Sequence, residues 1–390
     1  MKILYLCNVN RDSKAAVGVF KKINSQIDIL RKNNHVVHLA FYKTENVYSV
    51  IDSNNSVILS LELKGARGNQ RTNQILSQLY RLLSDQRYSV IYSRYETYSV
   101  SLANFYKKAS YSGCLVLLEI PTYPITQRIT TIKTSLEQRR YKTAMHQLYN
   151  ATINSLGIWS FKKGVTRIVN NNGFSKIWGI ETLKIHNAAD VSSLCQHTKT
   201  MKSGGDIHLV GVANIAKWHG YDRVIEGIKK YYLNGGKRKV FFHIIGTGLE
   251  LERLKKLASS SLVKDYIVFH GTVVGDELDD LFNQYDLGVS VLATYRSGMK
   301  NICDSLKSKE YCARGIPFIT GELEHFYDGK EFVLTIPDND TPVNIYNVCD
   351  FADRIADNPQ IKEAMLEFAK SYCGWDYSFR SVIDYLKGQE

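Results

Sequence analysis

The chain has 390 residues, a formal net charge of +12, 44% hydrophobic residues and 23% charged residues. This length predicts two domains, and the composition is typical of a globular protein. No apolar run reaches the roughly 18 residues that a membrane-spanning helix needs, and the N-terminus lacks the pattern of a signal peptide. We therefore expect a cytoplasmic protein rather than an integral membrane protein.

The first half of the chain alternates short apolar runs with amphipathic stretches. The apolar runs predict buried strands, and the first two of them flank a helix. The strands are expected at 3–7, 36–42, 90–94 and 115–120, and the helix at 19–32.

The same alternation restarts near residue 206, after the polar segment 197–206, which is typical of a loop or linker. Near-continuous apolar strands separated by helices predict parallel sheets covered on both faces. The expected fold class is therefore α/β, with two doubly wound Rossmann-like domains at 1–187 and 188–373 that bind ligands at the carboxyl ends of their strands. The second set of strands is expected at 207–213, 239–246, 266–271, 287–292 and 317–321, with helices at 221–233, 249–259, 277–285 and from 305.

Cysteine and histidine usage bears on the compartment and on metals. The seven cysteines are scattered and form no CxxC pair, which predicts reduced thiols rather than a disulfide framework or a structural zinc site. The ten histidines form no HxxxH motif, so we predict no catalytic metal.

Positive charge is concentrated in the first half. Residues 1–187 contain 26 Lys/Arg and 10 Asp/Glu, whereas residues 188–390 contain 24 and 28. Such a basic face attracts a phosphorylated substrate, an anionic membrane surface or nucleic acid. No recognised nucleic-acid-binding module accompanies the charge, so we expect no nucleic-acid partner. A solvated basic face is the alternative.

A second group of cations surrounds the start of the helix predicted from residue 305. It consists of Arg296, Lys300, Lys307 and Lys309. Because a helix N-terminus already presents partial positive charge, cations are disfavoured there unless a polyanion such as a diphosphate binds among them. Four solvated surface cations are the alternative interpretation.

Four segments of the second half, taken together and in order, resemble one enzyme family. They are a strand, loop and helix at 209–228, a Gly-x-Gly segment at 244–258, a strand–glycine–helix segment ending in an aspartate at 267–291, and SLKSKEYCARGIPFI at 305–319. This order is similar to the nucleotide-sugar-binding domain of the family 4 retaining glycosyltransferases, and its wording resembles a branch common in bacterial capsule and exopolysaccharide assembly.

The resemblance implies a GT-B fold, in which two Rossmann-like domains face each other across a cleft and a C-terminal helix, here 374–390, returns to the first domain. The glutamate matching Glu310 grips the ribose hydroxyls of the donor in that family. Lys217 would neutralise the donor diphosphate, and Gly18 would let the backbone of the first domain approach the phosphate or the sugar; a simple turn glycine is the alternative for Gly18. The remaining expected donor-site residues are Asn214, Gly246, Gly248, Ser305, Leu306 and Lys307.

The chain also departs from the family pattern. The family usually has an arginine shortly before the loop lysine, where this chain has Val212, Ala213 and Asn214. It also has a glutamate at the position of Ile302, where Asp304 is the nearest carboxylate here. The missing glutamate contacts donor sugar hydroxyls in the family, so the identity of the sugar stays open.

The catalytic residues expected in the first domain follow two predicted strands. Arg94 ends one strand and would bind an anionic acceptor, and Glu119 lies near the end of the next and would orient a hydroxyl. A buried glutamate satisfied by local amides is the alternative for Glu119. Further polar residues at these strand ends are Tyr95, Glu96, Thr122 and Tyr123.

We therefore expect a metal-independent, retaining hexosyltransferase without a cofactor, for which a UDP-sugar is the favoured co-substrate. The expected acceptor is a saccharide hydroxyl, lipid-linked, and the basic first domain would contact an anionic membrane from the cytoplasmic side. Two alternatives remain: a nucleotide-sugar epimerase of the same fold, and a non-catalytic GT-B-like partner of a transferase. A nicotinamide enzyme is disfavoured because no Gly-x-Gly-x-x-Gly follows the first strand.

Overall fold

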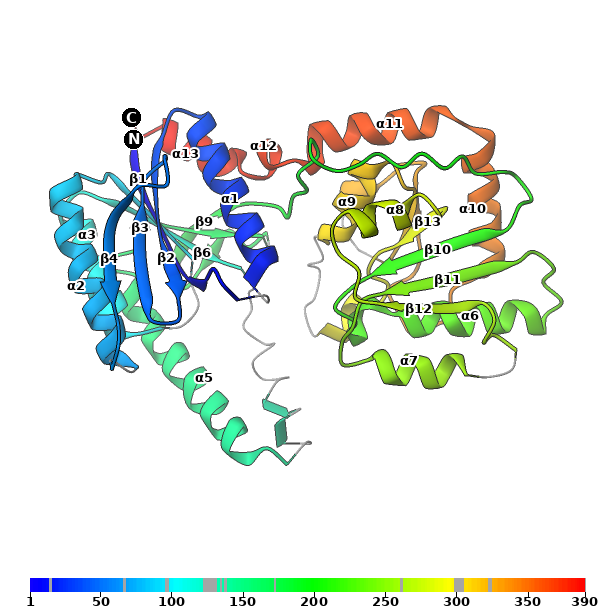
Figure 1. Cartoon of the computed structure of the whole chain (residues 1–390), viewed down its shortest axis with the longest axis horizontal. Coiled ribbons are helices and arrows are strands. Elements are labelled where there is room, and N and C mark those ends of the chain that lie inside the picture. Colours follow the sequence, from blue (N-terminus) through cyan, green and yellow to red (C-terminus); the bar gives the residue numbers. More distant parts are fainter. Residues whose placement is uncertain are drawn as a thin grey trace. The chain divides into compact units, whose positions relative to one another are not determined.

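The computed structural model describes residues 1–13, 16–65, 68–94, 98–121, 132–133, 135–136, 139–171, 173–259, 262–297, 305–321 and 325–389. The chain forms two compact units (Figure 1). Unit 1 comprises Met1–His186 and Phe379–Glu390, and unit 2 comprises Asn187–Ser378. None of the helices in the described ranges combines the length and apolarity that would let it cross a bilayer.

Unit 1 contains a sheet whose described strands number nine, in the order β4-β3-β2-β1-β5-β6-β7-β9-β8. The pairs from β2 through β1, β5, β6 and β7 to β9 are parallel, whereas β3, β4 and β8 pair antiparallel at the two edges. The strands are β1 Lys2–Asn10, β2 Val36–Thr44, β3 Val47–Ile51, β4 Val57–Glu62, β5 Val90–Arg94, β6 Leu115–Ile120, β7 Arg167–Asn170, β8 Lys176–Ile177 and β9 Ile180–Lys184.

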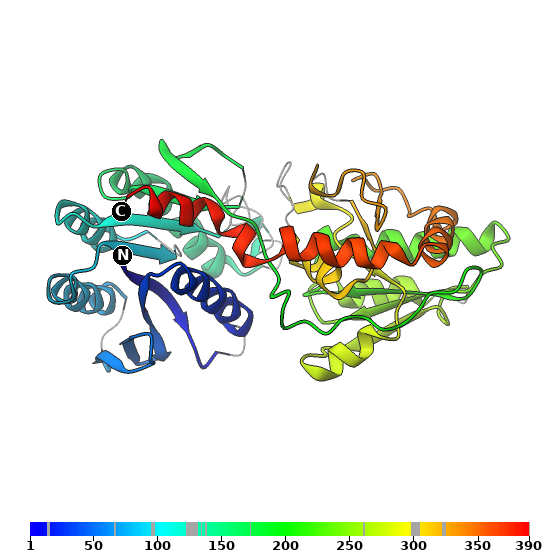
Figure 2. The same cartoon turned by 90° about the horizontal axis from the view of Figure 1, so that it is seen from above.

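Helices cover both faces of this sheet (Figures 1 and 2). On one face, α2 and α3 bury apolar side chains against β1, β5 and β6. On the other face, Tyr5 of β1 bonds to Gln26 of α1, and the Tyr92 ring of β5 lies 5.7 Å from the ring of Phe379, which directly precedes α13. The described helices are α1 Val17–Lys32, α2 Asn69–Gln86, α3 Val100–Tyr111, α5 Tyr141–Phe161 and α13 Arg380–Lys387.

Unit 2 contains a sheet of six described strands in the order β12-β11-β10-β13-β14-β15, and all of its pairs are parallel. Its two faces carry separate apolar clusters, so the strands are buried on both sides as their sequences predict. The strands are β10 Ile207–Val212, β11 Val240–Ile245, β12 Ile267–Gly271, β13 Leu287–Val289, β14 Phe318–Thr320 and β15 Val333–Thr335. The helices are α6 Tyr221–Leu233, α7 Leu251–Ala258, α8 Asp276–Phe282, α9 Leu306–Arg314, α10 Ile345–Asp357, α11 Gln360–Phe368 and α12 Trp375–Ser378.

The predicted fold class of two α/β domains with doubly wound parallel sheets is confirmed. The sequence analysis missed the antiparallel strands β3 and β4, and it expected one helix over 374–390 where the structure has α12 and α13. In unit 1 the strand order reverses beside β1, which pairs with β2 on one side and with β5 on the other. Ligands of such sheets bind at the carboxyl ends of the strands that flank this reversal.

Two glycines let the loops after β10 and β11 pack backbone against backbone. Gly246 has a φ of +123°, and a Cβ there would collide with the carbonyl oxygen of Ala213. A Cβ on Gly248 would collide with the backbone of Ile215, whose N–H donates to Thr247 O at 2.6 Å. Glycine is therefore required at both positions by the close packing of these two loops.

Three histidines form a row across neighbouring strands of unit 2. The ring nitrogens of His208 and His243 are 3.0 Å apart, and those of His243 and His270 are also 3.0 Å apart. Burial, together with the neighbouring imidazoles and the charge of Lys199, lowers the pKa of His243 to about 4. The central ring is therefore uncharged at neutral pH.

Replacing Gly246 with alanine tests the close approach of the two loops. We expect Gly246→Ala to lower the free energy of unfolding by about 3 kcal/mol, because strain at positive φ adds to a backbone collision. Gly235→Ala is the matched control, since Gly235 also has a positive φ but nothing lies within 4 Å of its Cβ position; it should cost about 1 kcal/mol. Equal losses in chemical denaturation would contradict this account.

Acid titration of stability tests the histidine row. The unfolded chain binds a proton at His243 near pH 6.5 and the folded chain only near pH 4, so this residue's contribution to stability is present above pH 6.5 and is lost as the pH falls toward 4. We expect His243→Gln to remove on the order of 2 kcal/mol of this pH dependence, whereas His146→Gln, at an exposed position, should remove none. Parallel stability profiles for the parent and His243→Gln would refute the assignment.

Candidate functional site

The loop that contains Lys217 lies at the carboxyl end of β10. Residues Lys217–His219 form a short 3-10 turn, and Gly220, with a φ of 66°, leads from it into α6. The backbone N–H groups of Leu292 and Ala293, which follow β13, donate to the carbonyls of His219 at 3.2 Å and Trp218 at 3.1 Å. This loop is therefore fixed to the segment that continues from the neighbouring strand.

The start of α9 is attached to the same end of the sheet, where β10 and β13 have their carboxyl ends. Ser290, directly after β13, has its hydroxyl 2.6 Å from that of Ser308 and donates to Ser305 at 3.3 Å. The buried Tyr311 hydroxyl donates to carbonyls of both β10 and β13. Because the Ser305 side chain does not cap the helix, its position reflects the bond to Ser290 rather than capping.

Lys307 joins these two parts. Its ammonium lies 5.7 Å from the centre of the Tyr221 ring, at the start of α6. Burial, together with the charge of Lys307, lowers the pKa of His219 to about 3, and the Ala216 N–H donates to His219 Nδ1 at 3.0 Å. At neutral pH the imidazole is therefore uncharged, and Lys307 supplies the positive charge beside it.

The structure thus brings the Lys217 loop and the start of α9 together at one end of the sheet. Lys217 and Leu306 are exposed, and Glu310, one turn into α9, is half-buried. Asn214 is exposed on the loop whose backbone packs against Gly246 and Gly248.

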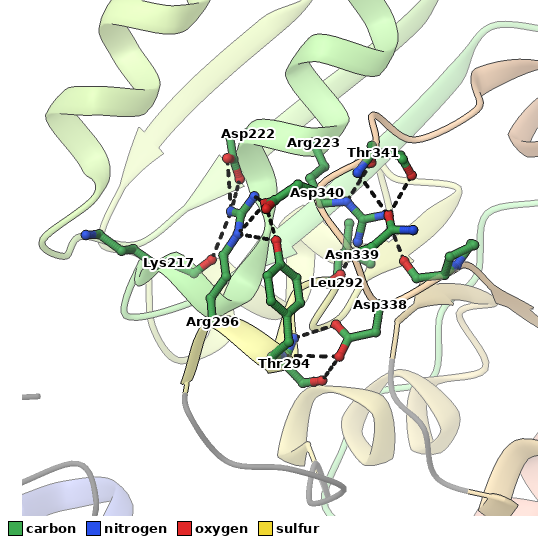
Figure 3. Close-up of polar contacts among 12 residues, drawn as sticks. Lys217, Asp222, Arg223, Leu292, Thr294, Arg296, Asp338, Asn339, Asp340 and Thr341 are labelled. Carbon is green, nitrogen blue, oxygen red and sulfur yellow. Dashed lines mark hydrogen bonds and ion pairs between the residues drawn. The ribbon is translucent and has the colours of Figure 1, made fainter.

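Arg296 has a structural role that the sequence analysis did not expect. Its guanidinium donates to both carboxylate oxygens of Asp222, at 2.8 and 2.9 Å, and it also pairs with Asp340 (Figure 3). Burial alone would lower the pKa of Arg296, but the hydrogen bonds to these carboxylates raise it. It also donates to the carbonyl of Lys217 at 3.3 Å, so it holds the loop, while the Lys217 side chain points away from this cluster in Figure 3.

Lys309 is buried, so the expectation that it faces a polyanion is wrong. Its side chain is 0% exposed, and its ammonium lies 3.3 Å from the centre of the Phe326 ring and 5.3 Å from that of Tyr327. Cation–π contact with these aromatic side chains helps to stabilise the ammonium in this interior position. Of the four predicted cations, Lys307 lies at the carboxyl end of β10, beside Tyr221. Lys300 lies outside the described residues, as do Ile302 and Asp304.

In unit 1, Arg94 and Glu119 lie opposite each other on β5 and β6 and form an ion pair at 3.1 Å. Lys22 of α1 approaches the same Glu119 oxygen at 3.2 Å, and Tyr92 donates to the other oxygen at 2.7 Å. Burial would raise the pKa of Glu119, but the Lys22 and Arg94 charges and the hydrogen bonds lower it, so the carboxylate stays ionised. Glu119 is satisfied by side chains, rather than by the local amides considered above.

The other residues expected in unit 1 are placed only in part. Gly18 lies exposed in the first turn of α1, where a Cβ would meet nothing within 4 Å, so packing does not require glycine there. Tyr95, Glu96, Thr122 and Tyr123 lie outside the described residues.

Sequence reasoning missed two partners of Glu119 on α1. Gln26 donates to the carboxylate at 3.1 Å, and it is four residues after Lys22, on the same face of the helix. This spacing of polar residues on a helix that covers a sheet was the available signal.

Comparison with known proteins identifies the fold. A glycosyltransferase from Rickettsia africae ESF-5 has a TM-score of 0.59 at 10% identity, over 99% of this chain and 98% of its own. Anabaena Alr3699/HepE in complex with UDP-glucose has a TM-score of 0.54 at 12% identity, over all of both chains. A putative UDP-N-acetylglucosamine 2-epimerase from Listeria monocytogenes has a TM-score of 0.51 at 8% identity, over 100% and 96%.

No family model matches the sequence, and no curated protein matches it either. At these identities the likeness shows the fold alone. The fold is that of the GT-B proteins, as the resemblance implies.

The cluster around Glu119 can be tested through stability. We expect Glu119→Gln to lower the free energy of unfolding by about 3 kcal/mol, because it leaves the charges of Lys22 and Arg94 without their buried counter-charge. Glu62→Gln, at a carboxylate that is 71% exposed, is the control and should change it by less than about 0.5 kcal/mol.

A double-mutant cycle isolates the ion pair. Arg94→Met should cost less in the Glu119→Gln background than in the parent, by about 1 kcal/mol or more. A Glu119→Gln protein that unfolds like the parent would show that the carboxylate does not stabilise unit 1.

Proposed function

We propose that this protein transfers a sugar from a nucleoside-diphosphate donor to a hydroxyl group of a saccharide acceptor. The observation that carries the proposal is the meeting of the Lys217 loop with the start of α9 at the carboxyl ends of β10 and β13. Parallel sheets bind their ligands at this end, and a helix N-terminus beside lysines favours a diphosphate. The GT-B fold is consistent with this chemistry.

In the proposed reaction the chain binds and neutralises the leaving group. Lys217 and Lys307, with the backbone amides of Ser305, Leu306 and Lys307, would hold the diphosphate as its charge develops. Glu310 would accept hydrogen bonds from the ribose hydroxyls. The ion pair between Arg296 and Asp222 would act indirectly, because it fixes the backbone of the Lys217 loop.

The details of the proposed reaction rest on the resemblance of the sequence to the family 4 retaining glycosyltransferases. They are retention of the anomeric configuration by front-side attack, independence of metal, a UDP-sugar donor, a lipid-linked saccharide acceptor and a place in bacterial surface polysaccharide synthesis. In front-side attack the donor phosphate takes the acceptor proton, so the protein contributes positioning and charge stabilisation. Lys22 and Arg94 are two positive charges beside the single negative charge of Glu119, so one positive charge is not neutralised. Arg94 would use it to bind an anionic acceptor.

An epimerase acting on a nucleotide sugar is the second candidate, because a putative epimerase shares the fold over the whole chain. Product analysis separates the two, since a transferase needs an acceptor, whereas an epimerase converts its sugar without one. A non-catalytic partner protein would bind nucleotide and show neither reaction.

Nucleotide binding tests the donor site directly. We expect UDP to raise the melting temperature of the full chain by mass action, and we expect Lys217→Ala and Glu310→Gln each to weaken UDP binding about tenfold, since each removes a charge-assisted contact. Isothermal titration calorimetry measures the affinities, and GDP, CDP and ADP test the choice of base.

The matched controls are Lys237→Ala and Glu252→Gln, which remove the same charges at exposed positions of unit 2. Both should bind UDP like the parent. Undiminished binding in Lys217→Ala and Glu310→Gln, in proteins with parental melting temperatures, would eliminate this donor site.

A further inference from the structure

Helix α5 of unit 1 carries a stripe of large apolar side chains that unit 1 does not bury. Tyr141, Met145, Leu148, Tyr149 and Trp159 are 61%, 73%, 57%, 61% and 75% exposed. Counted from Tyr141, they stand at i+4, i+7, i+8 and i+18, and at 3.6 residues per turn these positions share one face of a helix. Exposed apolar groups that line up in this way mark an interaction surface.

Two residues of α5 outside this stripe, Ala144 and Phe161, are buried. Ala144 is 3% exposed and Phe161 is fully buried in the apolar cluster of unit 1. Ser160 donates to the Tyr98 hydroxyl at 2.9 Å. Substitutions on the stripe therefore leave these contacts intact.

All Lys, Arg, Asp and Glu residues in the sequence around the stripe are positively charged ones. Residues 138–180 contain seven Lys/Arg and no Asp/Glu. Arg139, Arg140, Lys142, Lys162 and Lys163 are exposed at the two ends of α5. The partner of this surface must therefore combine an apolar layer with negative charge.

We propose that α5 docks unit 1 onto the surface of an anionic lipid bilayer. Tyr and Trp favour the interface between acyl chains and headgroups, where Met145 and Leu148 would enter the apolar layer while the basic residues contact anionic headgroups. A second copy of this chain is a poorer partner, because its α5 would bring the same positive charge to the contact. This proposal assigns to α5 the membrane contact that the charge of the first domain predicts, and it does not depend on the donor site.

Sedimentation of the full chain with lipid vesicles tests the proposal. We expect binding to vesicles of phosphatidylcholine mixed with phosphatidylglycerol, weaker binding to phosphatidylcholine alone, and loss of binding at high salt. Met145→Ser/Leu148→Ser/Trp159→Ser should lower the partition coefficient at least about tenfold, since it removes the groups that enter the bilayer. Arg139→Gln/Arg140→Gln/Lys142→Gln should remove most of the preference for anionic lipid.

The control is Val100→Ser/Tyr111→Ser/Leu249→Ser, which removes three side chains that are 64%, 75% and 88% exposed elsewhere on the chain. It should bind vesicles like the parent. A readout that needs no folded triple variant is tryptophan emission, which should shift to the blue when vesicles are added to the parent and shift less in Trp159→Phe.

Three results would overturn the proposal. They are absence of vesicle binding by the parent, undiminished binding by the folded stripe variant, and a dimer of the parent that the stripe variant abolishes, which would assign the stripe to contact between copies. UDP binding measured on the same variants keeps this outcome separate from the donor site, because the stripe variant should respond to UDP as the parent does.

Discussion

The candidate site of unit 2 depends on the ion pair between Arg296 and Asp222. This pair joins the turn after β13 to the first turn of α6, and Asp222 also pairs with Arg253 of α7 at 3.2 Å. A carboxylate in the first turn of a helix is favoured by the helix dipole, and here one guanidinium nitrogen donates charge-assisted hydrogen bonds to both carboxylate oxygens. The same guanidinium also donates to the carbonyl of Lys217. The Arg296–Asp222 ion pair therefore helps to fix the backbone of the loop that carries this lysine.

The fold was more predictable than the site. A strand that is buried on both faces has a nearly continuous apolar sequence, as at 207–213 and 239–246. Such strands can therefore be predicted from the sequence alone. The edge strand β4 has no buried residue, and β3 is only 5 residues long, so neither has the long apolar sequence of a strand buried on both faces. The likeness to GT-B structures then agreed with the order of four motifs, none of which is specific alone.

The roles of the charged residues depend on contacts that no local pattern encodes. Lys309 and Lys307 are two residues apart on α9, so they point in different directions: one is buried on Phe326 and the other lies beside Tyr221. Arg296 has its carboxylate partners 74 and 44 residues away in the sequence. Lys22 and Gln26 reach Glu119 from another element altogether. Sequence spacing predicts which residues share a helix face, but not what lies opposite that face.

The division of unit 1 into two stretches of sequence has a consequence for how the chain folds. Phe379 packs against Tyr92 and is fully buried, and Leu386 of α13 is fully buried as well. A ribosome releases these residues only after all of unit 2 has emerged, so unit 2 has its complete sequence first while the β5 face of unit 1 still awaits its cover. During synthesis, unit 1 is therefore the last to close its apolar interior, although most of its strands are made before unit 2, and the part of its sheet that Phe379 covers stays exposed until then.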